Sequence, residues 1–220
     1  MMPNPLIALL GLYALVSAQG YGQMGLPPSK NQPAATKKAA APAIALLPAV
    51  PGRGMRDVPN IAIKFYDVSG KDFAEIIDAI GKLRPKDPAT KQVMAGGAGW
   101  GLGANVSRQT ENGKCTVVQA KAEFTPTAEL PRLVNEGALA PDQLAAWRAY
   151  LSHLEVPAAA SLWFVLDRLP AYEKSLVGVD CDAAMKLGAE GIAKIRADHD
   201  EFQRQYAARQ AASAPPAPKK

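Results

Sequence analysis

The chain has 220 residues and a formal net charge of +5, from 25 lysines and arginines against 20 aspartates and glutamates. This length suits one domain of ordinary size with flanking segments. The flanking stretches 1–56 and 211–220 hold seven of the basic residues and no acidic ones, so residues 57–210 carry 18 basic against all 20 acidic residues. Binding of nucleic acid needs basic residues clustered on an ordered surface, and this distribution excludes nucleic acid as a partner.

Residues 1–18 have the pattern of a secretory signal peptide. An apolar run covers residues 5–16, and the small residues Ser17 and Ala18 offer a cleavage site before Gln19. The run is short for a bilayer span, although an N-terminal anchor that stays uncleaved is the alternative. We therefore predict bacterial export, with a periplasmic or secreted location.

The segments on either side of the predicted domain have the composition of flexible chain. Residues 19–56 are rich in Pro, Ala, Gly and Lys, and residues 211–220 contain Ala, Ser, Pro and Lys alone. We predict a linker at 19–56, a domain at 57–210 and a disordered tail at 211–220. Within the linker, the apolar run 43–50 either docks on the domain or is a linker with scattered aliphatic residues. The basic residues of both segments would allow weak contact with an anionic envelope surface.

The first half of the predicted domain shows strand and hairpin patterns around one helix. Residues 61–66 favour a strand, and residues 71–83 form an amphipathic helical pattern. From 99 to 106 glycine or asparagine alternates with larger apolar residues, which predicts a strand with one bare face that a neighbouring backbone or peptide can approach closely. Asn112 and Gly113 predict a two-residue hairpin turn. The return strand is expected to end at Pro126 and Pro131.

Two long helices are predicted in the second half. Pro141 and Asp142 suit the first turn of a helix whose apolar positions continue to residue 169. Pro157 lies inside this run, where it either kinks the helix or begins a second one, because an interior proline costs about 3 kcal/mol. Asp180 can cap the final helix, which has apolar positions at spacings of three and four up to residue 206. We expect the two helices to pack as an antiparallel hairpin.

The chain has two cysteines, Cys115 and Cys181. Export would place them in an oxidising compartment, so we predict a disulfide that links the hairpin to the final helix. Two separate buried thiols are the alternative. A zinc site made from the pair is disfavoured, because the cysteines lack the close C-x-x-C spacing of such sites.

Residues 153–157 read His-Leu-Glu-Val-Pro and resemble an incomplete metal-binding helix. The zinc-protease motif H-E-x-x-H places a second His four residues after the first, on the same helix face, and a general-base Glu directly after the first His. Here His153 stands at the first ligand position, Leu154 at the base position and Pro157 at the second ligand position. Glu155 is about 200° around the helix from His153, so these two cannot share a metal ion.

A wider set of motifs supports a family resemblance over roughly residues 57–208. In chain order, the motifs are the turn at 65–70, Leu-Arg-Pro-Lys-Asp at 83–87, the strand with Trp100, the hairpin with Cys115, the helix with Trp147 and His153, then Cys181 and the acid–His–acid run 198–200. With these motifs the chain resembles the bacterial predicted secreted zinc-dependent proteases, a group catalogued mainly as a domain of unknown function. The resemblance implies a metallopeptidase-like fold with His ligands, of which His153 alone carries over onto the motif.

His199 is the second histidine of the chain and lies on the apolar stripe of the final helix. One hypothesis places His153, His199 and Asp200 around a metal ion, where Asp200 matches the acidic position that the family implies, and makes Glu155 the catalytic residue. The other makes His199 a histidine at the edge of the core with one hydrogen bond. We favour the second, and therefore predict no cofactor; zinc belongs to the first.

The sequence thus predicts an α+β fold, with a small antiparallel β-sheet packed against long helices in a zincin-like arrangement and with disordered tails. We interpret the chain as an exported, non-catalytic relative of a secreted zinc metallopeptidase that binds or scaffolds a protein or peptide in the periplasm or envelope. Two alternatives remain. The first is an active metal-dependent peptidase with an unusual ligand set, and the second is a structural envelope protein with cationic tails.

Overall fold

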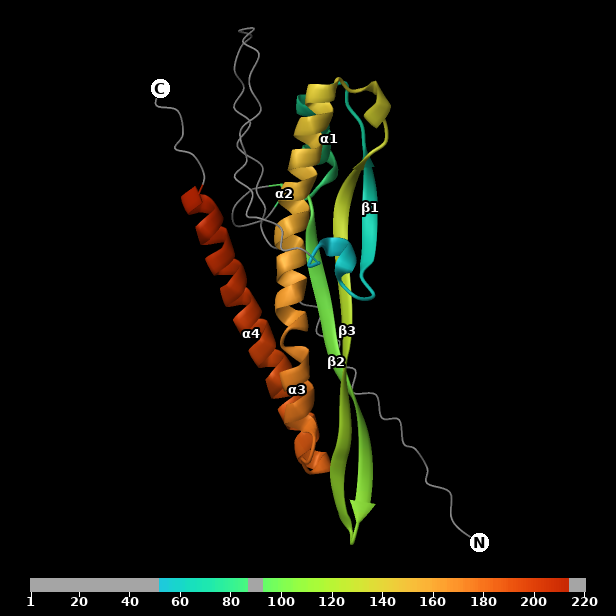
Figure 1. The fold of residues 1–220 in the computed structure, drawn as a ribbon, viewed down its shortest axis with the longest axis vertical. Helices are drawn as coiled ribbons and strands as arrows, with labels where there is room; N and C mark the ends of the chain where they lie inside the picture. The colour runs from blue at the N-terminus through green and yellow to red at the C-terminus, as the bar shows by residue number, and fades with distance from the viewer. Residues whose placement is uncertain (1–51, 87–92, 214–220) are drawn as a thin grey trace, which may run out of the picture.

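The structure, a computed structural model, describes residues 52–86 and 93–213, with no side-chain detail after residue 210. The predicted signal peptide 1–18, the apolar run 43–50 and residues 214–220 lie outside the described residues. The described part is a mixed α+β fold, which confirms the predicted class (Figure 1). Its elements are η1 (Met55–Asp57), β1 (Ala62–Val68), α1 (Phe73–Leu83), β2 (Gly97–Glu111), β3 (Lys114–Leu133), η2 (Glu136–Ala138), α2 (Pro141–Leu166), α3 (Leu169–Leu176) and α4 (Cys181–Ser213).

The sheet has the order β1-β3-β2. β2 and β3 are antiparallel, but β1 runs parallel to β3, so the prediction of a purely antiparallel sheet is wrong in this respect. The physical reason is long-range: α1 returns the chain to the start of β2, and the hairpin then reverses it, so that β3 runs in the direction of β1. The predicted hairpin turn is confirmed, because Asn112 and Gly113 both have positive φ angles, 51° and 78°.

β3 continues through Pro126 and Pro131, so the prediction that the strand ends at these prolines is wrong. β3 pairs with β1 from Thr127 onward and with β2 up to Glu129. It therefore has a strand on both sides only at residues 127–129. The N–H of Ala122 points away from β2 to the Glu173 carboxylate. Backbone N–H groups alternate in direction along a strand. The backbone nitrogen of Pro126 therefore points toward the β1 side of β3, at a position before β1 begins. The backbone nitrogen of Pro131 points toward the β2 side, at a position after β2 has ended. Each proline therefore costs no sheet hydrogen bond.

Two glycines of β2, Gly99 and Gly101, pair directly with threonines of β3, Thr127 and Thr125. A Cβ atom on Gly101 would lie 2.5 Å from Oγ1 of Thr125, and one on Gly99 would lie 3.2 Å from Oγ1 of Thr127. The opposite face of β2 carries Trp100 and Leu102, which are buried. The expected close approach to the bare face is therefore made by threonine side chains of β3 within the sheet.

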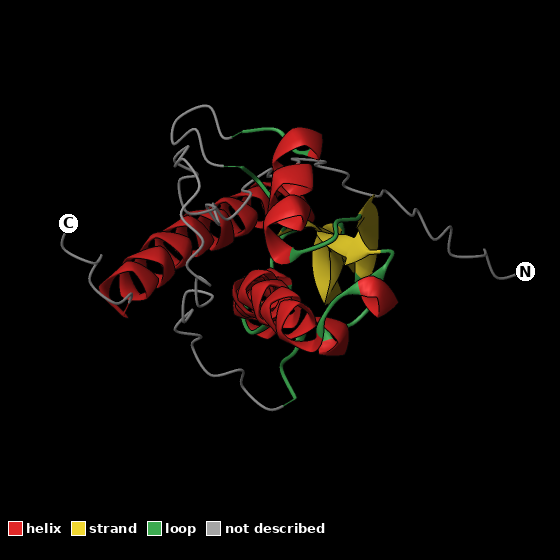
Figure 2. Ribbon diagram, turned by 90° about the horizontal axis from the view of Figure 1, so that it is seen from above, coloured by secondary structure: helices red, strands yellow, loops and turns green. Residues whose placement is uncertain are grey.

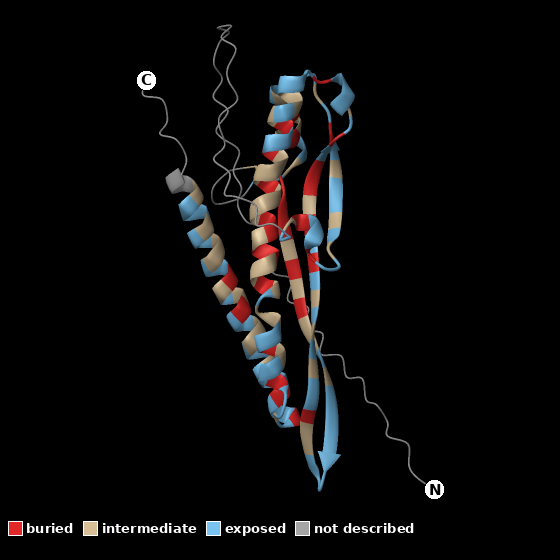
Figure 3. Ribbon diagram, viewed as in Figure 1, coloured by how far each residue is buried: buried red, intermediate tan, exposed pale blue. Residues whose placement is uncertain are grey.

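α2 is one continuous helix that contains Pro157, so the proline does not begin a second helix. Figure 3 shows its buried positions in red, and Figure 2 shows α2 beside the sheet with α4 further out. α4 leans away from α2 toward its C-terminal end (Figure 1). The buried side chains of α2 are Trp147, Tyr150, Leu154, Ala158, Ala159, Ser161, Leu162 and Val165.

Residues 52–58 lie against the C-terminal half of α2. The Arg53 guanidinium donates two hydrogen bonds to the Asp167 carboxylate, at 2.7 and 3.1 Å. Trp163 Nε1 donates to the Gly54 carbonyl at 3.3 Å, and Met55 and Val58 are buried. The last residues of the predicted linker thus have a fixed place on the domain, and at the other end α4 continues to Ser213, inside the predicted tail.

Candidate functional site

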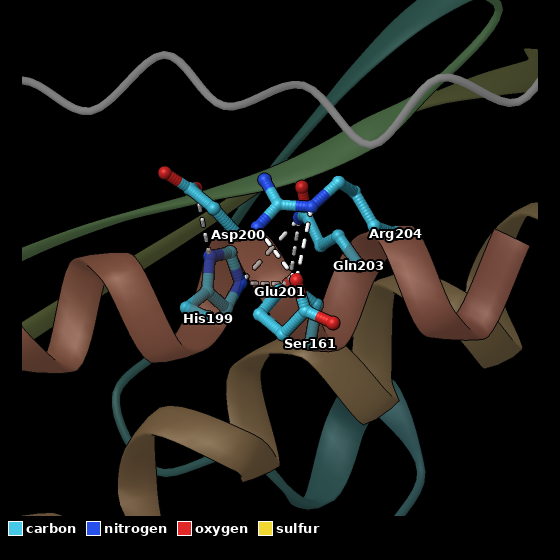
Figure 4. A network of polar contacts seen from close by, with 6 residues as sticks. All are labelled: Ser161, His199, Asp200, Glu201, Gln203 and Arg204. Atoms are coloured by element: carbon cyan, nitrogen blue, oxygen red, sulfur yellow. Dashed lines mark hydrogen bonds and ion pairs between the residues drawn. The ribbon is translucent and has the colours of Figure 1, made fainter.

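A buried polar group joins α2 to α4 at Ser161 and His199 (Figure 4). Ser161 Oγ lies 2.6 Å from His199 Nε2, and the two residues are 5% and 3% exposed. Gln203, one turn after His199 on α4, places its Nε2 3.3 Å from Ser161 Oγ. In the described part of the chain, Ser161 and His199 are the two polar residues that are buried.

The donors and acceptors of this group form one consistent chain. The Gln203 amide can only donate through its nitrogen, so Ser161 Oγ accepts from it and is free to donate its own proton. His199 Nε2 then accepts from Ser161, which places the imidazole proton on Nδ1. His199 Nδ1 is 3.9 Å from Asp200 Oδ1, which is beyond hydrogen-bond distance. The neutral imidazole is therefore the form that this network stabilises.

Aromatic side chains surround the imidazole. The Trp100 ring meets it edge to face with centroids 5.6 Å apart, and the Phe164 ring lies at 6.0 Å. This burial lowers the pKa of His199; Asp200 acts in the opposite direction, and Arg168 and Arg196 add to the lowering. At neutral pH, His199 is accordingly an uncharged acceptor within an aromatic environment.

A serine hydroxyl beside a neutral histidine is also the nucleophile–base pair of many hydrolases. In this protein the pair is enclosed, because the low exposure of Ser161 and His199 gives a substrate carbonyl no approach to Oγ. The carboxylate that would orient the imidazole is too distant for a hydrogen bond. The geometry instead fits an interhelical lock that fixes α4 on α2.

His153, the first predicted metal ligand, lies elsewhere on α2. It is half-buried, and this burial lowers its pKa. Eight residues separate it from Ser161, a distance of about 12 Å along the helix axis. In the stretches 52–86 and 93–213, no three His, Cys, Asp or Glu side chains lie close enough together to hold a metal ion. The structure thus brings His199 near Asp200 but does not bring His153 to them.

The other positions of the incomplete motif also have definite places. Leu154 is 1% exposed and packs in the core beside Leu130 and Trp147. Glu155 is half-buried on the far side of the helix from His153, as the 200° separation requires. Pro157 stands where the second histidine of the motif would be, inside unbroken helix. The carbonyl of His153 therefore lacks the N–H donor that residue i+4 usually provides.

Ser161 was not among the site residues predicted from the sequence. Its partner is 38 residues away, so no local spacing connects the two. The available signal was a hydroxyl residue within an apolar stretch of helix, because buried polar groups in proteins are usually hydrogen-bonded.

The predicted disulfide between Cys115 and Cys181 is confirmed. It joins β3 to the first residue of α4, far from the Ser161–His199 pair. Beside it, the N–H of Val117 donates to the Val179 carbonyl at 2.9 Å, and the N–H of Gly178 donates to the Val117 carbonyl at 2.8 Å. These bonds brace the distal part of the hairpin against the start of α4.

Comparison with known proteins gives one family. The family described as bacterial protein of unknown function (DUF922) matches residues 63–212. The comparisons with curated proteins and with solved structures gave no significant match. The matched region includes all but the first residue of the sheet and, up to residue 212, the four α-helices that the structure describes.

Proposed function

The chain belongs to the DUF922 family of bacterial proteins, and from this premise we propose that it is an exported, non-catalytic binding or scaffolding module of the periplasm or envelope. We further propose that the module descends from a secreted zinc metallopeptidase whose H-E-x-x-H helix corresponds to α2. Its partner would be a protein or peptide.

The observation that carries this proposal is the environment of Leu154. A general base must contact the water that attacks the substrate. Position 154 instead points into the apolar core, where Leu154 packs with Leu130 and Trp147. The adjacent changes are consistent with this, because Pro157 occupies the second ligand position without breaking the helix. The helix has kept its packing role while the motif has changed.

The disulfide supports the location. A stable disulfide is typical of proteins in oxidising compartments, and Cys115–Cys181 is compatible with the periplasm or the cell exterior. None of the helices that the structure describes is long and apolar enough to cross a membrane.

The shape of the hairpin supports a scaffolding role. The β2–β3 ladder runs from Gly97↔Glu129 to Glu111↔Lys114, and 15 residues of strand span about 50 Å. Its distal end is exposed, as Figure 3 shows in pale blue, and the disulfide braces it. A long, braced arm of this kind can present a defined surface to a partner.

Metal analysis of the purified full chain tests the non-catalytic part of the proposal. The protein is purified without chelators, and its zinc content and its cleavage of unstructured peptides are measured with and without a chelator. We expect less than stoichiometric zinc and no chelator-sensitive cleavage. Stoichiometric zinc that is lost in His153→Ala but retained in the control Ser152→Ala would overturn it.

Fractionation of the native host cell tests the location. The chain should be found in the periplasmic or secreted fraction, with both cysteines protected from alkylation until a reductant is added. Free thiols on a chain confined to the cytoplasm would contradict export.

A further inference from the structure

The first half of α4 is held to the rest of the domain by covalent and apolar contacts. The disulfide joins Cys181, its first residue, to β3. Ala184 and Ile195 are buried, and the Tyr172 ring of α3 packs so closely on α4 that a Cβ atom on Gly191 would lie 2.8 Å from it. This half of the helix therefore has a fixed place on the domain.

The second half of α4 has less support. His199 is the last buried residue of the helix among those described, because the side chains from 200 to 210 are exposed or half-buried. Beyond His199, α4 contacts α2 through the stack of Phe202 on Phe164, with ring centroids 4.5 Å apart. Figure 1 shows α4 leaning away from α2 toward its C-terminal end. A helical end with so little buried surface opens at a lower free energy than the core does.

The polar group at the boundary between the two halves depends on a neutral imidazole. Gln203 Nε2 lies 3.3 Å from Ser161 Oγ and 3.4 Å from His199 Nε2. With the neutral ring, Nε2 accepts the Ser161 proton and Ser161 Oγ accepts from Gln203. With a proton on Nε2, the imidazole and the Gln203 amide would both donate toward one hydroxyl oxygen, and the Ser161 proton would lose its acceptor. Protonation therefore disrupts the hydrogen bonds that join α2 to α4.

The surroundings also disfavour a positive charge on this imidazole. Of the charged groups that act on it, Arg196 and Asp200 lie on α4, and Arg168 follows the C-terminal end of α2. Asp200 is exposed, and its carboxylate is 3.9 Å from Nδ1, so water screens its attraction. β2 contributes the Trp100 ring and α2 the Phe164 ring, which cannot replace the water around a cation. An imidazolium would thus stand among aromatic rings with two cations against one screened carboxylate.

We propose that the Ser161–His199 pair is an acid-sensitive latch: the neutral imidazole holds the second half of α4 on α2, and protonation of the imidazole releases it. The disulfide and the buried residues of the first half keep that half in place, so the movement is confined to the helix beyond the latch. Release uncovers the facing rings of Phe164 and Phe202. This latch goes beyond the proposed function and does not depend on it.

The direction of the pH effect follows from the burial of His199. Burial lowers its pKa in the closed state, and in the released state the ring returns to water, where its pKa returns toward the ordinary 6.5. The released state therefore binds a proton more readily than the closed state. As the pH falls below 6.5, the equilibrium shifts toward release until the closed state is protonated as well.

Amide exchange of the full chain, measured at several pH values, tests the latch. A short helical end is marginal in water on its own, so release appears as faster exchange. Relative to the intrinsic rate at each pH, the opening constant of residues 203–210 should rise about fivefold between pH 7.5 and pH 5. His199→Gln should abolish this rise, whereas His153→Gln, which changes the half-buried histidine of α2, should keep it. Ser161→Ala should raise the opening constant already at pH 7.5.

Urea separates release from unfolding of the whole domain. Opening of residues 203–210 should depend on urea much less than opening of the β3 amides, because release exposes little surface. Equal urea dependence in the two segments would overturn the proposal, since α4 would then open only together with the domain. A pH-dependent rise that persists in His199→Gln would also overturn it, because another group would then control the opening.

Discussion

Leu154 and His153 are adjacent in α2 but lie in different environments. Leu154 is 1% exposed among core side chains of the sheet and α2, whereas His153 is half-buried. Successive helical residues are about 100° apart. With His153 at the edge of the buried face of α2, the side chain at position 154 therefore points into the core. Restoring the glutamate of the zinc-protease motif at position 154 would therefore bury a carboxylate.

The substitution Leu154→Glu should lower the free energy of unfolding by about 3 kcal/mol or more, from lost packing and a buried charge. Ala145→Glu, at an exposed position on the same helix, should change it by less than about 0.5 kcal/mol. Urea unfolding measures both. A stable Leu154→Glu variant that gained zinc-dependent cleavage would show that the core position is adaptable and would contradict the assignment.

Stability should depend on pH through His199. Burial lowers its pKa below the ordinary 6.5, so the unfolded chain binds a proton more readily than the folded chain. The stabilising effect of the neutral imidazole is complete above pH 6.5 and is lost as the pH falls from there toward the folded-state pKa. Unfolding free energies measured between pH 8 and pH 4.5 should show this slope.

The variant His199→Gln separates the contribution of His199 to the pH dependence of stability from the contributions of other titratable groups. It removes the His199 contribution, so its stability should change less between pH 7 and pH 5 than that of the original chain. His153→Gln is the comparison, because burial also lowers the pKa of His153 and its removal should flatten the curve separately. An unchanged pH slope in His199→Gln would mean that His199 has the same pKa in the folded and unfolded chains, which would contradict the lowered pKa.

Local chemistry was sufficient for the elements whose signals are local. Asp72 accepts from the Glu75 N–H at the start of α1, Asn112 and Gly113 adopt the turn that their residue types favour, and Pro141 begins α2. The disulfide could also be predicted from the sequence, because the chain has two cysteines and a predicted signal peptide. In each case the residues that decide the structure are close in sequence or few in number.

The rest depended on partners distant in sequence. Pro126 and Pro131 indicate strand ends as long as the limits of β1 and β2 are unknown. Those limits decide which backbone N–H groups of β3 form hydrogen bonds to a neighbouring strand. The parallel pairing of β1 could not be read from its own residues. Ser161 was missed because its significance comes from His199 on another helix. The boundaries at 18, 56 and 210 stay predictions.

The disulfide should make a large contribution to stability. It joins residues 66 positions apart, and closing a loop of that length restricts the unfolded chain by about 4 kcal/mol in the entropic description. The double substitution Cys115→Ser and Cys181→Ser should therefore lower the urea midpoint substantially. The original chain measured in reductant should show the same loss, and agreement between the two would exclude an effect of the serines themselves. A loss below about 1 kcal/mol in both would show that the unfolded chain is already compact near this loop.

Two tyrosines, the half-buried Tyr66 and the buried Tyr150, offer a test of hydrogen bonding at the core. The Tyr66 hydroxyl donates to the Ala95 carbonyl, whereas the Tyr150 hydroxyl is buried with no hydrogen-bond partner among the described residues. Tyr66→Phe should cost about 1–3 kcal/mol, because the buried Ala95 carbonyl loses its donor. Tyr150→Phe should be neutral or stabilising, because it removes an unpaired polar atom and keeps the ring contacts with Phe73 and Trp147. Thermal and urea unfolding of the two variants would decide the point, and a Tyr150→Phe cost equal to that of Tyr66→Phe would reveal a bound water or a contact from outside the described residues.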